Sequence, residues 1–285
     1  MKRQMSNWAL FLCFAALTGA SIAAVVWLYL KIANIGITVI WDMVPNYIDS
    51  RHYTIIMCLI GGLFVGIFHK FYGPYPESMA DSVRRVKTTG TYPYKNLPVT
   101  VAAAFLSLFF GGAVGPESGL VCLLLGLCFW AMDQFGMARE KMEAMIGNNP
   151  YIPRGEVFRE MARGLASPPS RIVYDKGKII WKRSESVSAG VTAGIVGLIV
   201  YILLNRLLGA GLSVPHLEDT AMNALDRAGA ILLIAVGIGA GYLFLIFKKL
   251  ANLFFAKMRS KGLHVLNAVL GGLVLGVIGT IFPMT

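Results

Sequence analysis

The chain has 285 residues, of which 56% are hydrophobic and only 14% are charged, and its formal net charge is +11. Soluble globular proteins carry roughly 25% charged residues, so this composition excludes an ordinary soluble domain and predicts an integral membrane protein. The positive charge does not indicate a nucleic-acid partner, because Lys and Arg flank apolar segments, as they do in the cytoplasmic loops of membrane proteins.

The first apolar segment, 8–30, begins shortly after the N-terminal Met-Lys-Arg. It is longer than the apolar core of a signal peptide, which has about 7–15 residues, and it supplies the roughly 20 residues that a spanning helix needs. We therefore predict a retained transmembrane helix here, followed by a connecting loop over 32–52.

Further apolar segments follow in the rest of the chain and predict an all-α polytopic membrane protein. They lie at 53–70, 97–135, 187–207, 227–248 and 264–282.

The segments between these spans differ in charge. Lys and Arg are abundant in 70–96, 137–186 and 248–263, whereas 208–226 has acidic residues and no Lys or Arg. Basic loops favour the cytoplasmic side of a membrane. The expected topology therefore places the N-terminus in the cytoplasm and the chain in the plasma (inner) membrane.

Two of the apolar segments share a pattern of glycines. Ile60–Ile67 reads IGGLFVGI and Leu270–Val277 reads LGGLVLGV, with the glycines at matching positions. Each copy contains a Gly-x-x-x-Gly spacing, which lets membrane helices approach closely. The expected topology runs the two copies in opposite directions, as in transporters built from inverted repeats.

The same topology makes segment 97–135 begin and end on the cytoplasmic side, so the chain must turn within the membrane at the Gly- and Pro-rich stretch 111–119. Non-helical backbone at membrane depth is tolerated only where it is buried in protein or lines a wet cavity. We therefore predict first-repeat membrane helices over 1–135 with a broken, re-entrant pair, a polar cytoplasmic connecting segment over 136–186, and membrane helices that start a second repeat over 187–285.

The break leads into the sequence Gly-Pro-Glu-Ser-Gly, in which Pro116 suits the first position of a helix because it has no N–H to leave unpaired. The free amides and the dipole of a helix that starts there make a positive end that binds anions. Glu117 would lie in this first turn. Ionised, its carboxylate can occupy the anion site, and protonated or displaced it leaves the site open.

The stretch 97–126, LPVTVAAAFLSLFFGGAVGPESGLVCLLLG, resembles the helix-break-helix region of the chloride channel and transporter (CLC) family, most closely that of divergent bacterial members. A Gly-x-Glu-Gly-Pro motif in that family carries a glutamate that gates the anion path. Gly115-Pro-Glu-Ser-Gly119 aligns with this motif, so the resemblance implies that Glu117 is the gate. The implied anion-binding residues are Gly115, Pro116, Glu117, Ser118, Gly119, Leu120, Gly73 and Tyr75.

Two regions depart from the family pattern. Tyr72–Glu77, YGPYPE, stands where the family has Gly-Ser-Gly-Ile-Pro-Glu, and Gly73 takes the place of a serine that contacts the anion. The sequence ends with IFPMT, before the family's second Gly-rich helix start and its gating tyrosine. The second repeat is therefore expected to be incomplete, within a CLC-like inverted-repeat architecture.

The function that the resemblance implies is permeation of chloride or another small halide-like anion, by a channel or a proton-coupled exchanger. The implied partners are chloride, fluoride or nitrate, protons, the lipid bilayer and a second copy in a homodimer, with no cofactor. The alternative is a truncated homologue that does not transport, or a subunit that needs a separate partner chain.

We predict no enzymatic or metal site. Ser118 lies in a sequence faintly like the Gly-x-Ser-Gly of intramembrane serine proteases, but Pro116 replaces the first glycine. The histidines lie at span edges or in loops, where none is placed to activate a serine: His52, His69, His216 and His264. The cysteines lie in apolar runs without metal-ligand spacing: Cys13, Cys58, Cys122 and Cys128.

Overall fold

The computed structural model is all-helical in the part of the chain that it describes, which is 2–48, 52–112, 116–148, 155–156, 159, 163, 183–209, 224–260 and 262–281. Only the backbone is described for 2–11, 116, 118, 135–148, 183–186, 224–228, 231 and 259–260. The chain forms two compact units. The first contains 1–38, 75–108 and 114–211, and the second contains 39–74, 109–113 and 212–285.

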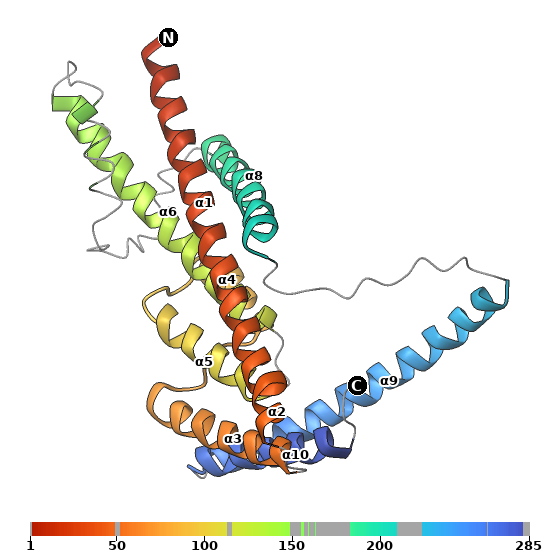
Figure 1. Cartoon of the computed structure of the whole chain (residues 1–285). Helices are drawn as coiled ribbons and strands as arrows, with labels where there is room; N and C mark the ends of the chain where they lie inside the picture. The colour runs from red at the N-terminus through yellow and green to blue at the C-terminus, as the bar shows by residue number, and fades with distance from the viewer. Residues whose placement is uncertain are drawn as a thin grey trace. The chain divides into compact units, whose positions relative to one another are not determined.

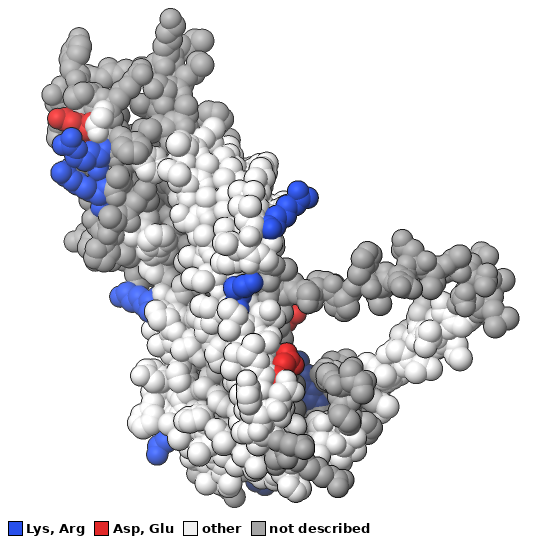
Figure 2. All heavy atoms as spheres, in the orientation of Figure 1, with Lys and Arg blue, Asp and Glu red and all other residues white. Residues whose placement is uncertain are grey.

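In the part of the chain that the structure describes, five helices are long and apolar enough to cross a membrane, so the integral membrane class predicted from composition agrees with the structure. Much of the described surface in Figure 2 is uncharged. The crossing segments are Leu12–Tyr47, Tyr53–Tyr72, Val187–Leu208, Leu232–Met258 and His264–Ile281.

The first unit contains α1 (Lys2–Thr38), α4 (Met79–Thr89), α5 (Leu97–Phe109, whose last residue belongs to the second unit), α6 (Pro116–Asn148) and α8 (Arg183–Leu208). Helices α1 and α8 lie side by side in Figure 1. A Cβ atom at Gly19 would overlap the backbone of Ala193, and the Lys31 ammonium donates to the Leu208 carbonyl at 3.1 Å. These two contacts make the helices parallel, as the predicted topology requires.

Gly19 sets the close approach of α1 and α8, and replacing it with alanine is expected to separate them. The added methyl group would meet backbone atoms, which cannot rotate away, so we expect a loss of about 1–3 kcal/mol in stability. Thermal unfolding in detergent measures the effect. Gly194→Ala on α8 is the matched control, because a Cβ there has nothing within 4 Å. Equal melting temperatures for the two variants would contradict this packing.

Helices α5 and α6 form an antiparallel hairpin. A Cβ atom at Gly119 would lie 2.6 Å from the Cβ of Ala104, and one at Gly126 would lie 2.6 Å from a methyl group of Leu97. Helix α5 has 13 residues, a length of roughly 20 Å. It is therefore too short to cross a hydrocarbon core of about 30 Å. Over these contacts the two helices run in opposite directions, joined by the break that follows Phe109.

The second unit contains α3 (Tyr53–Tyr72), α9 (Ala224–Ser260) and α10 (His264–Ile281). Helices α3 and α10 pack side by side through the two copies of the glycine repeat (Figure 1). A Cβ atom at Gly62 would lie 2.6 Å from the Ala268 carbonyl oxygen, and one at Gly272 would overlap the Cys58 carbonyl oxygen.

These contacts between α3 and α10 are reciprocal. Gly272 is the repeat counterpart of Gly62, and Ala268 is the counterpart of Cys58. The Gly62–Ala268 contact and the Gly272–Cys58 contact are therefore exchanged when the two copies are exchanged. The antiparallel pair therefore has a local pseudo-two-fold axis perpendicular to the helices, as an isologous contact requires. This is the relation that inverted-topology repeats have in membrane transporters.

Two predicted segment boundaries differ from the structure. The helical backbone does not end at residue 30, because α1 continues into a π-helical turn (Val39–Met43) and α2 (Val44–Tyr47). The predicted loop 32–52 is thus largely helical. The boundary at 135/136 falls inside α6, which continues to Asn148. Most of the predicted connecting segment 136–186 lies outside the described residues.

Candidate functional site

The break between α5 and α6 begins at the carbonyl end of α5. Helix α5 ends at Phe109, and Gly111 adopts a φ of 71°, in the left-handed region that favours glycine. The Trp41 indole N–H donates to the Phe109 carbonyl oxygen at 3.0 Å, which satisfies one of the last carbonyls of the helix. The Trp41 ring also covers Gly111, where a Cβ would lie 2.9 Å from it.

Helix α6 begins at Pro116, and Glu117 lies in its first turn. In an α-helix each N–H donates to the carbonyl four residues earlier, so the first amides have no partner within the helix. Pro116 has no N–H. The amides of Glu117 and Ser118 therefore have no partner within the helix, while the N–H of Leu120 faces the carbonyl of Pro116.

This first turn is closely packed on one side. Gly119 is buried, and a Cβ there would overlap the Tyr29 hydroxyl of α1 and lie 2.6 Å from the Cβ of Ala104 on α5. Glycine is required at this position because two neighbouring helices approach the backbone of α6 at the same point. The start of α6 is thus fixed against both α1 and α5.

Tyr29 is a residue that sequence reasoning missed. Its side chain is only 3% exposed, its ring stacks on Phe105 with centroids 4.8 Å apart, and its hydroxyl has no hydrogen-bond partner in the described structure. Tyr29 also lies near the middle of the apolar run Leu12–Tyr47. The first turn of α6 therefore lies beside the middle of this apolar run.

The Glu117 side chain is exposed, which differs from the enclosed first turn that the sequence led us to expect. The buried face of the turn is the Gly119 face, and Glu117 points away from it because the two residues are two positions apart on the helix. The carboxylate is therefore free to move, whereas the backbone beside it is held in place.

Two of the predicted anion-binding residues are already engaged elsewhere. The Gly73 N–H donates to the His69 carbonyl at 3.1 Å and ends α3, so it has no free donor for an anion. The Tyr75 hydroxyl accepts a hydrogen bond from the Asn96 side chain at 2.9 Å. These contacts occupy the Gly73 amide and one acceptor position of the Tyr75 hydroxyl, while Gly115 lies outside the described residues.

A buried polar cluster holds α4 against α6. The Ser82 hydroxyl lies 3.5 Å from the Cys122 sulfur, and the side chains of both residues are fully buried. Glu77, the acid of the YGPYPE stretch, forms an ion pair with Arg85 at 2.6 Å. Burial raises the pKa of the Tyr92 phenol beside this cluster, and its contact with Cys122 adds to the shift. Tyr92 is therefore protonated at neutral pH.

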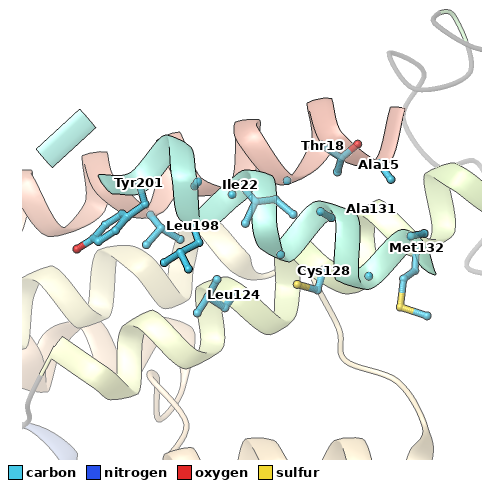
Figure 3. Close-up of a pocket in the computed structure, with 17 residues that line it drawn as sticks. Ala15, Thr18, Ile22, Leu124, Cys128, Ala131, Met132, Leu198 and Tyr201 are labelled. Atoms are coloured by element: carbon cyan, nitrogen blue, oxygen red, sulfur yellow. The ribbon is translucent and has the colours of Figure 1, made fainter. Parts of the chain in front are cut away.

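A cavity of about 580 Å³ lies between α1, α6 and α8. Figure 3 shows Thr18 and Ile22 of α1, Leu124 and Cys128 of α6, and Leu198 of α8 around it. Its lining has no charged side chain and includes none of the predicted anion-binding residues. This apolar cavity does not suit an anion.

No protein-family model, curated protein or solved structure matches the chain.

Proposed function

We propose that this protein conducts a small inorganic anion, chloride or another halide-like ion, across the membrane past the first turn of α6. The observation that carries the proposal is the start of α6 at Pro116, after the break that follows α5, with an acid in its first turn. Two unused amides and the helix dipole create a positive site at a depth where ions are otherwise poorly solvated.

Glu117 is the gate in this proposal. Its ionised carboxylate and a permeant anion compete for the same amides, so the site opens when the carboxylate is protonated or displaced. The exposure of its side chain supports this role, since an exposed carboxylate has room to swing. The permeant anion then takes the place of the carboxylate at these amides, and the first turn of α6 stays folded.

Replacing Glu117 with glutamine is expected to abolish the pH dependence of anion flux. In the wild type, flux should be highest at low pH and fall as rising pH ionises the carboxylate. The glutamine variant cannot ionise, so its flux should stay high at every pH. The measurement is chloride efflux from proteoliposomes between acidic and neutral pH, repeated with fluoride and nitrate.

Glu156→Gln is the matched control for this experiment, because Glu156 is also exposed but lies outside α5 and α6. It should retain the wild-type pH profile. A Glu117→Gln variant that keeps the wild-type pH profile would refute the gating role.

A second candidate function is a membrane subunit that works with a separate chain. The observation in its favour is α9, whose apolar side chains between Leu232 and Phe254 are largely exposed and lack neighbours that bury them. An exposed apolar helix is covered in the membrane by lipid or by another protein. Absence of any anion leak from purified, folded protein in liposomes would favour this candidate over permeation.

A further inference from the structure

We propose that the Tyr29 hydroxyl is a ligand of the permeant anion at the start of α6, and that it selects charge-dense halides over nitrate. The inference rests on the proposed function and names a residue outside the helix hairpin that forms the site.

The hydroxyl is placed at the site by its contact with α6. It lies against the Gly119 backbone in the first turn, where a Cβ atom would overlap it. Stacking of the ring on Phe105 at an interplanar angle of 24° restricts the side chain, so the hydroxyl cannot leave without disrupting the packing of α1 on α5.

The hydroxyl also lacks a partner. Buried hydroxyl groups in proteins are nearly always hydrogen-bonded, because burial without a partner is unfavourable. Tyr29 is 3% exposed, and its oxygen has no hydrogen-bond partner in the described structure. An anion bound to the amides of Glu117 and Ser118 would supply the missing acceptor, and the O–H would add a third donor.

Selectivity follows from the strength of this hydrogen bond. A donor to an ionised acceptor is roughly twice as strong as one between neutral groups. The bond strengthens as the charge of the acceptor becomes more concentrated, so fluoride and chloride gain more from the hydroxyl than nitrate, whose charge is shared by three oxygens. Loss of the hydroxyl should therefore weaken halide binding most.

The test is Tyr29→Phe, which removes one oxygen and keeps the stacked ring. Thermal unfolding of the purified full-length protein is followed as chloride replaces a large organic anion at constant ionic strength. Binding to the folded state raises the melting temperature with increasing chloride. We expect the variant to need about tenfold more chloride for the same rise, with a smaller change for nitrate. Tyr201→Phe on α8 is the matched control and should behave as wild type.

Fold integrity is controlled by the melting temperature without chloride. It should be equal to or higher than that of wild type, because the variant loses only an unpartnered hydroxyl. A clearly lower value would mean that the hydroxyl has a protein partner, and it would overturn the inference. If Tyr29→Phe needs the same chloride concentration as wild type for a given rise in melting temperature, and the pH dependence of flux still requires Glu117, this inference is wrong and the proposed function stands. If the wild-type protein shows no flux of chloride, fluoride or nitrate and none of them raises its melting temperature, both this inference and the proposed function are wrong.

Discussion

Replacing Gly272 with alanine is expected to lower the stability of the protein by about 3 kcal/mol, at the upper end of the range for overpacked sites. The new methyl group would overlap the Cys58 carbonyl oxygen of α3 and lie 3.3 Å from the Cα of Gly62. Both are backbone atoms, so the helices must move apart along their whole contact. Membrane helices gain most of their association energy from such close packing. Thermal unfolding in detergent measures the loss.

The neighbouring glycine is the matched control for this prediction. A Cβ at Gly271 has nothing within 4 Å, so Gly271→Ala should leave the melting temperature close to that of wild type. The double variant Gly62→Ala/Gly272→Ala tests the reciprocal contact. Because either methyl group alone separates the helices, the loss of stability in the double variant should be smaller than the sum of the losses in the two single variants. Additive losses, or equal effects at Gly271 and Gly272, would contradict the pseudo-two-fold pair.

Replacing Gly119 with alanine is expected to reduce anion flux about tenfold or more, the effect of losing one charged hydrogen bond. The methyl group would overlap the Tyr29 hydroxyl and lie 2.6 Å from the Cβ of Ala104. The first turn of α6 must then shift away from α1 and α5. The amides of Glu117 and Ser118 would move with it and no longer face the same point. Chloride efflux from proteoliposomes is the measurement.

Gly126→Ala is the control that separates the loss of flux in Gly119→Ala from a general effect of adding a methyl group between α5 and α6. Its Cβ would lie 2.6 Å from a terminal methyl of Leu97, which can rotate away, so both stability and flux should change little. Adding Tyr29→Phe to Gly119→Ala removes the overlapping oxygen and should recover part of the stability but not the flux. Wild-type flux in Gly119→Ala would show that the anion does not pass this turn.

The local features of the site follow from the sequence because they depend on neighbouring residues. A proline followed by an acid and small residues favours a helix start, and α6 begins at Pro116. The glycine spacing in 60–67 and 270–277 predicted close contact. Within these runs, the glycines that lie between α3 and α10 are Gly62, Gly66, Gly272 and Gly276. The alternation of basic and acidic loops gave relative helix directions that agree with the parallel α1–α8 and antiparallel α3–α10 pairs.

The failures concern groups whose partners are distant in sequence. A tyrosine in an apolar helix has no pattern that marks it as a ligand, and Tyr29 became a candidate only when α1 packed against the start of α6. Residues 39–47 are helical although Asp42 lies among them, and Trp41 there donates to Phe109.

The amino-acid sequence by itself determined the class of the protein, the spans and the helix start at Pro116, because hydrophobic length, proline and glycine act within a few residues. Only the tertiary structure decided which glycine of each pair meets the other helix and which hydroxyl lies against Gly119. The physical reason is that helix rotation is fixed by contact between helices, and no local pattern specifies the partner of a buried polar group.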